Sequence, residues 1–357
     1  MNERTQDDVD RQLTQAGELW RAEQPPAVEP DIHRLTALPR RPSMRRRLAV
    51  AATMAAALTA GLVVATNGTD HAKLSPAAAL FNQAAAHTLR TGDPTVRPGQ
   101  YRYLRTHAWY LSMLAVAGGG QQASFLSEQL YEEWIPADEH GVWYWRYTRP
   151  MSAHFFNAAD EKYVRSHQPE MLERKVELYE GADGTITRDL TPGSAGGTVN
   201  SGATAPGWSR PTTAWLAALP RDPDALLVRI YADNPANKGD GKPSKDDRAF
   251  TAISDLLRSG LVPADLQAAL YRAAAKLPGI TLVDSTANLD GQRGVAIGLV
   301  DASHQSRHDI IFDAAAGRFI GEREVALRAG DGSSVPAGAV TASTAVTLSV
   351  VDEPGFH

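Results

Sequence analysis

The pattern of apolar and polar positions begins with one long apolar run near the N-terminus. No charged residue interrupts the chain from Leu48 to Thr69, and the run Leu48–Thr66 holds only Ala, Val, Leu, Met, Gly and Thr. About 20 residues of α-helix cross the hydrocarbon core of a bilayer. A buried helix of a soluble protein shows a polar stripe, which this run lacks. We therefore predict a transmembrane helix over 48–69.

The charges beside this run orient it in the membrane. The residues just before it include a group of arginines with no acid among them: Arg40, Arg41, Arg45, Arg46 and Arg47. Basic residues mark the cytoplasmic side of a membrane helix, so the tail 1–47 is predicted inside the cell and the remainder outside. A cleavable signal peptide with Val63-x-Ala65 as its cleavage site is the alternative. The tail is much longer than the basic region of a signal peptide, which favours the anchor.

Alternation with period two predicts antiparallel strands in the first half of the outer part. The aromatic residues of these segments favour strands, and successive side chains of a strand point to opposite faces. Trp143 and Trp145 thus share a face, and with Trp134 they are the candidate lining of a pocket for an apolar or sugar-like ligand. The alternative is that the rings only form core. The predicted strands cover 99–111, 125–135 and 142–148.

Helical periodicity dominates the next part of the chain and then gives way to alternation. Asp222 and Pro223 are a typical N-cap and first position of a helix, and 263–277 carries an apolar stripe at helical spacing. Helices followed by a meander of hairpins indicate an α+β fold with an antiparallel, curved sheet. The later predicted strands cover 280–283, 294–300, 309–313, 318–327 and 345–351.

These patterns give a predicted organisation of the whole chain. Its sections are a largely irregular cytoplasmic tail (1–47), a transmembrane helix (48–69), a linker and helix (70–98), aromatic-rich antiparallel strands (99–190), a flexible Gly/Ser/Pro loop (191–213), a helical segment (214–278) and an antiparallel hairpin meander (279–357).

Composition and charge narrow the function classes. Hydrophobic residues make up 43% and charged residues 22% of the 357 residues, which is typical of a folded protein. The net charge of -5 argues against nucleic-acid binding, which needs a basic face. Cysteine is absent from the sequence, which removes disulfides, thiolate nucleophiles and Cys-based zinc sites.

The sequence contains none of the common catalytic motifs H-E-x-x-H, G-x-S-x-G, Walker A and G-x-G-x-x-G. His304 and His308 have the spacing of two metal ligands on a helix. They fall in a predicted polar loop between strands, so we expect solvated loop histidines. The sequence predicts no catalytic residue, no cofactor and no metal site.

Several segments behind the Arg-rich anchor carry a family resemblance. They are LPRDPDALL from Leu219, AFTAISDLLRSGLVPADLQAALYRAAAKLPGI from Ala249, DGQRGVAI from Asp290 and IIFDAAAGRFIGERE from Ile310. Their combination resembles a family of uncharacterised actinobacterial single-pass membrane proteins known only by a locus tag. The resemblance implies topology and compartment but no activity. At the level of fold alone, the pattern is similar to lipoprotein carriers and to the sigma-factor regulatory proteins that share their fold.

The expected function is that of a non-enzymatic protein of the cell envelope. Its outer domain is predicted to sense or bind an unknown ligand and to relay this through the membrane to the tail. The bilayer is the predicted partner of residues 48–66. The sequence also allows a protein partner on either side of the membrane. The alternatives are a lipid- or glycolipid-binding module of the carrier type and, less favoured, an enzyme of the cell envelope.

Overall fold

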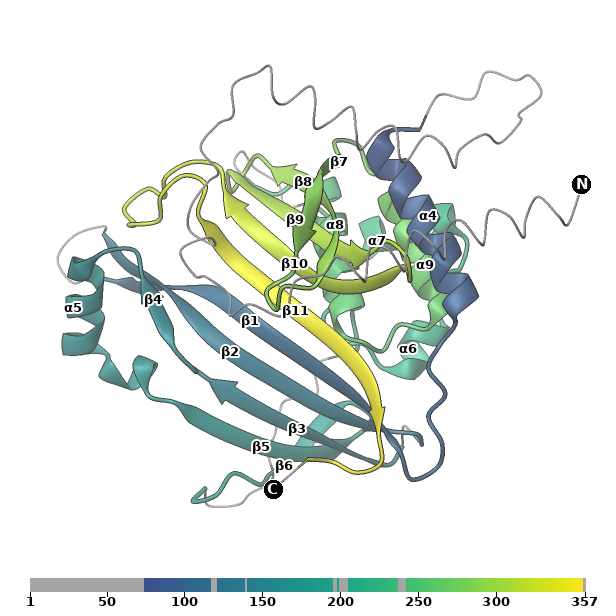
Figure 1. Cartoon of the computed structure of the whole chain (residues 1–357), viewed down its shortest axis with the longest axis horizontal. Helices are drawn as coiled ribbons and strands as arrows, with labels where there is room; N and C mark the ends of the chain where they lie inside the picture. The colour runs from purple at the N-terminus through teal and green to yellow at the C-terminus, as the bar shows by residue number, and fades with distance from the viewer. Residues whose placement is uncertain are drawn as a thin grey trace, which may run out of the picture. The chain divides into compact units, whose positions relative to one another are not determined.

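An antiparallel sheet of 11 strands organises the described part of the chain (Figure 1). The computed structural model describes residues 74–355, apart from 117–120, 139, 195–197, 199–204 and 237–241. The predicted transmembrane helix and its flanking arginines lie outside these residues. Within the described ranges, no helix has both the length and the apolar character to cross a membrane.

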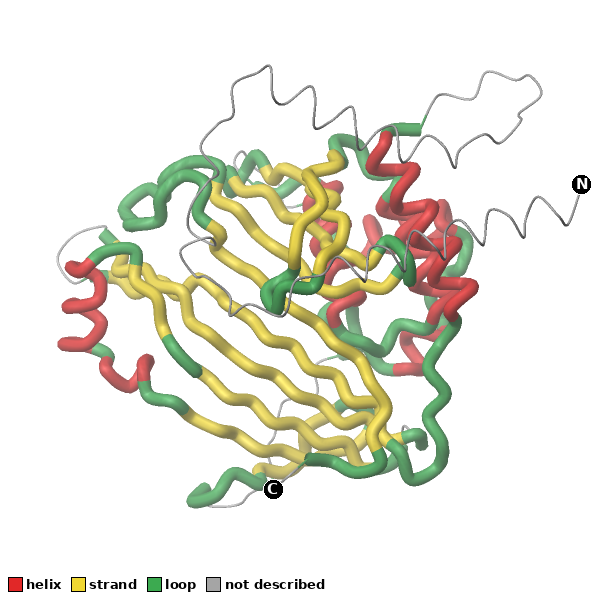
Figure 2. The backbone as a smooth tube through the Cα atoms, in the orientation of Figure 1, coloured by secondary structure: helices red, strands yellow, loops and turns green. Residues whose placement is uncertain are grey.

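The strand order joins both halves of the chain in one sheet: β6-β5-β3-β2-β1-β11-β10-β9-β8-β7, with β4 beside β2. Figure 2 shows the long central strands running side by side and bending along their length. The predicted α+β class with an antiparallel sheet is confirmed. The strands are β1 (Tyr101–Ala115), β2 (Gln122–Pro136), β3 (Val142–Arg149), β4 (Ala153–Phe155), β5 (Lys175–Ala182), β6 (Thr185–Asp189), β7 (Thr281–Ala287), β8 (Arg293–Asp301), β9 (Ser306–Asp313), β10 (Arg318–Ala326) and β11 (Val340–Val351).

The helices begin at residues that can satisfy free backbone N–H groups. Asp222 caps its helix as predicted, since its carboxylate accepts hydrogen bonds from the backbone of Asp224 and Ala225. Ser244 and Asp247 form a reciprocal capping box. The α-helices are α4 (Pro76–Thr91), α5 (Ala158–His167), α6 (Thr213–Ala217), α7 (Pro223–Asp233), α8 (Lys245–Arg258) and α9 (Ala264–Ala274), and η1 (Pro169–Leu172) is a short 3-10 helix.

The main core lies between one face of the sheet and the helices α4, α7, α8 and α9. Leu104 of β1, Val346 of β11 and Ile310 of β9 belong to this core, and we call the face they share the helix-bearing face. Phe81 of α4 is fully buried, with its ring stacked on Phe312 at 5.7 Å between centroids. This burial of apolar side chains fixes the helices on one side of the sheet.

Pairing of β1 with β11 connects the strands before the helical segment with those after it. The register runs from Tyr101 opposite Val351 to Tyr110 opposite Ala342. The helix α8 is fitted closely against this junction. Its last turn is followed by Gly260 at φ +64, where an added Cβ would lie 2.7 Å from a methyl carbon of Leu104. Only glycine combines this left-handed backbone with so close an approach.

Candidate functional site

The tryptophans of the predicted pocket are divided between the two faces of the sheet. Trp145 of β3 lies opposite Glu133 of β2, and Glu133 lies opposite Leu104 of β1. Since Leu104 belongs to the helix-bearing face, Trp145 is on that face too. Trp143 is two residues away on the same face, and the two rings stack with centroids 5.9 Å apart. Both are buried and pack against Ile135 and further apolar residues. The structure thus brings these two rings together.

Trp134 is buried on the opposite face, because it follows Glu133 directly in the strand. Its ring lies 5.1 Å from the ring of Tyr103, and the guanidinium of Arg146 lies over it at 5.3 Å. The Arg146 guanidinium also makes two hydrogen bonds to the Glu132 carboxylate, at 2.6 and 2.7 Å. Trp134 therefore belongs to a polar and aromatic cluster separate from the other two tryptophans.

A cavity of about 620 Å³ opens elsewhere on the helix-bearing face. Its walls come from α8, from the strands β8 to β10, and from Tyr110 of β1 and Trp208. Trp208 lies in the predicted Gly/Ser/Pro loop, yet its side chain is buried and its indole N–H donates to Asp233 at 3.2 Å. The cavity lining does not include Trp134, Trp143 or Trp145.

A buried ionic network centred on Glu322 of β10 forms one wall of this cavity. Glu322 is 4% exposed. Its carboxylate accepts hydrogen bonds from the Arg258 guanidinium and the Ser254 hydroxyl, both from α8, and His308 Nε2 lies 3.0 Å away. Arg258 also pairs with Asp255. A buried carboxylate with this many charged and polar partners is held firmly in one position.

The pKa directions follow from these contacts. Burial alone raises the pKa of the Glu322 carboxyl, but the Arg258 charge and the His308 hydrogen bond outweigh it and hold the pKa well below its usual range. For His308, burial lowers the pKa, and Glu322 outweighs this and raises it. For Asp255, burial prevails over Arg258 and the pKa is raised. The network therefore favours an ionised Glu322 beside a protonated His308.

Local structure explains why these residues meet. Ser254 and Arg258 are four residues apart on α8 and so lie on one face of the helix. In the pairing of β9 with β10, His308 is opposite Glu324, two residues from Glu322 on the same face. The wall is therefore built from one helix face and one sheet face.

The two histidines considered as metal ligands, His304 and His308, differ in outcome. His304 lies in the β8–β9 turn with its side chain 64% exposed, bonded to Asp301, so its prediction as a solvated loop histidine is confirmed. The same prediction for His308 is wrong. The turn is short and β9 begins at Ser306, before the predicted start, so His308 lies on the strand with its ring against Phe250 at 5.4 Å.

The network does not have the order of a nucleophilic triad. The Ser254 hydroxyl is fully buried and donates to a carboxylate, whereas a catalytic serine donates to a general base such as histidine. Among the described residues, no group of three or more His, Asp or Glu side chains is placed to hold a metal ion. The arrangement is suited to holding a charged wall in place.

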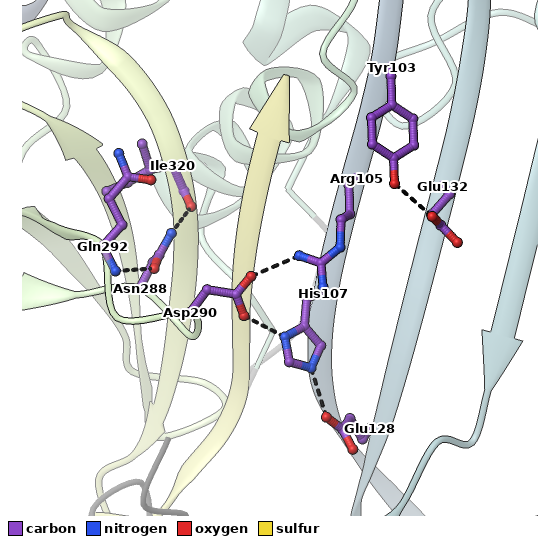
Figure 3. A network of polar contacts seen from close by, with 9 residues as sticks. All are labelled: Tyr103, Arg105, His107, Glu128, Glu132, Asn288, Asp290, Gln292 and Ile320. Carbon is purple, nitrogen blue, oxygen red and sulfur yellow. Dashed lines mark hydrogen bonds and ion pairs between the residues drawn. The ribbon is translucent and has the colours of Figure 1, made fainter. Parts of the chain in front are cut away.

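A second polar network lies on the opposite face and ties the β7–β8 turn to the centre of the sheet (Figure 3). Asp290 reaches past β11 to β1, with one carboxylate oxygen 2.8 Å from the Arg105 guanidinium and the other 2.5 Å from His107 Nδ1. His107 Nε2 lies 2.8 Å from Glu128 of β2. Asn288 anchors the turn by donating to the carbonyl of Ile320 at 2.8 Å. The network links the β7–β8 turn to β10, β1 and β2, and we call it the clamp.

The His107 ring has a carboxylate at each nitrogen, and its side chain is only 11% exposed. A neutral imidazole can donate from only one nitrogen, so the protonated form fits both partners best. Burial lowers the pKa of His107, but the hydrogen bonds to Asp290 and Glu128 outweigh this and raise it. The clamp is therefore strongest when His107 carries its charge.

Comparisons with protein-family models, curated proteins and solved structures give no match. The family resemblance of the sequence stays a prediction, and the candidate site stands on its geometry. Sequence reasoning missed both networks. The available signal was a run of charged residues inside a predicted strand, Glu322-Arg323-Glu324 of β10, together with polar residues four apart on α8.

Proposed function

We propose that the chain is a membrane-anchored binding protein whose extracytoplasmic domain takes up a small ligand in the cavity beside α8. The anchor rests on the apolar run 48–66 and the arginines before it. Binding rests on one observation, the cavity of about 620 Å³ with a wall of fixed charges. Ligand sites are concave and place a few polar groups among apolar ones, and here Phe250 and Leu299 supply apolar lining.

The charged wall supports binding more than it supports stability. A buried ion pair is often no more stabilising than apolar residues of the same volume, because the charges lose their hydration. A specific binding site, however, benefits from polar side chains that neighbouring residues already hold in place. Such side chains lose little conformational entropy when the ligand binds. Glu322 and Arg258 meet this description, as each has partners within the protein and both line the cavity.

Filling the cavity tests the proposal. Thr251 lines the cavity from an exposed position of α8, so Thr251→Trp should fill it without disturbing the core. The full-length protein in detergent micelles is mixed with the small-molecule fraction of its own cell envelope, and the unfolding temperature is recorded. We expect the fraction to raise the unfolding temperature of the wild type and to leave that of Thr251→Trp unchanged.

The matched control is Val228→Trp, which adds the same side chain at an exposed position of α7 that does not line the cavity. This variant should respond to the fraction as the wild type does. An equal response of wild type and Thr251→Trp, or no response of the wild type, contradicts the proposal.

A further inference from the structure

We propose that the ligand is a small zwitterion whose carboxylate is bound by Arg248 and whose ammonium group faces Glu324. This inference rests on the proposed function and specifies the chemistry of the same cavity. It comes from the charged side chains of the lining, which fall into those that already have partners and those that do not.

Among the described residues of the lining, Arg248 is the cation whose side chain makes no hydrogen bond or ion pair. It lies in the first half of α8 and lines the cavity, and its Nε is buried with no hydrogen-bond partner. A buried donor without an acceptor is unfavourable, and most buried donors of folded proteins have a hydrogen-bond partner. The guanidinium fork matches a planar carboxylate, which can accept two parallel hydrogen bonds from it. Arg248 is thus a binding group for an anion.

With one exception, the acidic side chains of the lining accept hydrogen bonds or form ion pairs within the protein. Asp247 accepts from the backbone of Ser244 in the capping box, and Asp301 accepts from the turn that follows it. Asp255 and Glu322 pair with Arg258. These contacts keep the four carboxylates in place.

Glu324 is the exception. Its side chain is half-buried in the lining, and within the described part of the chain it makes no hydrogen bond or ion pair. It lies opposite His308 in the strand register, and its charge helps to raise the pKa of that imidazole. A carboxylate in this position attracts a cation or a hydrogen-bond donor.

The sum of charges then limits the ligand. The lining holds five carboxylates against three guanidinium groups and the His308 imidazolium. The carboxylates belong to Asp247, Asp255, Asp301, Glu322 and Glu324, and the guanidinium groups to Arg248, Arg258 and Arg323. A phosphate dianion at Arg248 would meet strong repulsion from these acids, whereas a single carboxylate adds one charge. An ammonium group near Glu324 offsets that charge. A small zwitterion, such as the end groups of an amino acid or short peptide, carries the two groups that Arg248 and Glu324 would bind.

The experiment measures binding of matched dipeptide probes to the full-length protein in detergent micelles by calorimetric titration. The probes are alanylalanine, its C-terminal amide, which lacks the carboxylate, and its N-acetyl form, which lacks the ammonium group. We expect alanylalanine to bind at millimolar concentration, and each altered probe to bind about tenfold more weakly, the effect of one lost charged contact.

Substitutions assign each end of the probe to a residue. Arg248→Gln should reduce alanylalanine binding about tenfold and abolish the difference between alanylalanine and its amide. Glu324→Gln should abolish the difference between alanylalanine and its N-acetyl form. Arg90→Gln, at an exposed arginine of α4, is the matched control and should bind all probes as the wild type does.

The outcomes separate this inference from the proposed function. If alanylalanine does not bind, or binds equally well to Arg248→Gln, the zwitterion assignment is overturned. If the envelope fraction still stabilises the wild type and not Thr251→Trp, the cavity binds a ligand of other chemistry and the proposed function stands. If the fraction has no effect either, both proposals fail.

Discussion

Replacing Arg258 by Met tests whether charge pairing holds the cavity wall. The substitution removes the guanidinium that pairs with Glu322 and Asp255 and keeps an unbranched apolar chain in place of the aliphatic stem of arginine. The Glu322 carboxylate, 4% exposed, is then left with the Ser254 hydroxyl and His308. Breaking a buried pair on one side costs about 3–5 kcal/mol. Since the Arg258 side chain is 29% exposed, we expect about 3 kcal/mol, the lower end of that range.

A second substitution, at Glu322, measures how strongly Arg258 and Glu322 depend on each other for stability. In the double variant with Arg258→Met and Glu322→Leu no uncompensated carboxylate remains at position 322, so this variant should be more stable than Arg258→Met alone by about 2 kcal/mol. The assay is urea unfolding of the full-length protein in detergent micelles, followed by tryptophan fluorescence. A double variant whose loss equals the sum of the two single losses would show that the side chains contribute by packing, and would refute the argument from charge.

The pH dependence supplies an independent check on the same network. The pKa of Glu322 is lower in the folded protein than in the unfolded chain, where it is about 4.3. The contribution of Glu322 to the free energy of unfolding is therefore fully present above about pH 4.3 and is lost as the pH falls through the folded-state pKa. The loss of stability caused by Glu322→Gln should therefore become smaller in acid. A loss that is constant with pH would contradict an ionised Glu322.

Three further predictions concern other parts of the molecule, each tested by the same unfolding assay. The raised pKa of His107 means that its clamp contributes fully below about pH 6.5 and is lost as the pH rises through the folded value, so His107→Gln should cost most in mild acid and least in alkali; the reverse trend would refute this. Gly260→Ala should cost about 1–3 kcal/mol more than Gly92→Ala, since both positions have positive φ but only the first meets a neighbouring side chain; equal losses would count against the steric argument. Burial raises the pKa of Glu133 to about 7, so ionisation costs the folded state, and Glu133→Gln should be more stable than wild type above this pH with the gain fading toward pH 4; an unchanged stability in alkali would contradict it.

Local patterns predicted most of the elements of the described part. The apolar stripe of 263–277 gave the helix α9, and alternation gave the strands β1 to β3 and β7 to β11. The helix α5 was not predicted, because its segment AADEKYVRSH has Val164 as its only buried residue and shows no stripe. The strands β5 and β6 were not assigned individually, since side chains on both of their faces are largely polar.

The candidate site could not be read from the sequence because its contacts are distant along the chain. Arg258 and Glu322 are 64 residues apart, and each on its own has the character of a surface charge. Their burial follows from α8 lying on the helix-bearing face, which depends on the order of strands. The tryptophans were identified as a group by proximity in sequence, whereas the pleat of β2 sends Trp134 to the other face.

The junction of β1 and β11 also bears on how the protein is made. The two strands are neighbours in the middle of the sheet, although one opens the sheet's sequence and the other closes it. During synthesis β2 can cover one edge of β1 early, while the other edge stays bare until the last strand has emerged. Such non-local pairing makes folding slow and leaves an edge open to aggregation meanwhile. A truncation before Val340 removes the centre of the sheet and leaves two half-sheets, each with an unpaired edge.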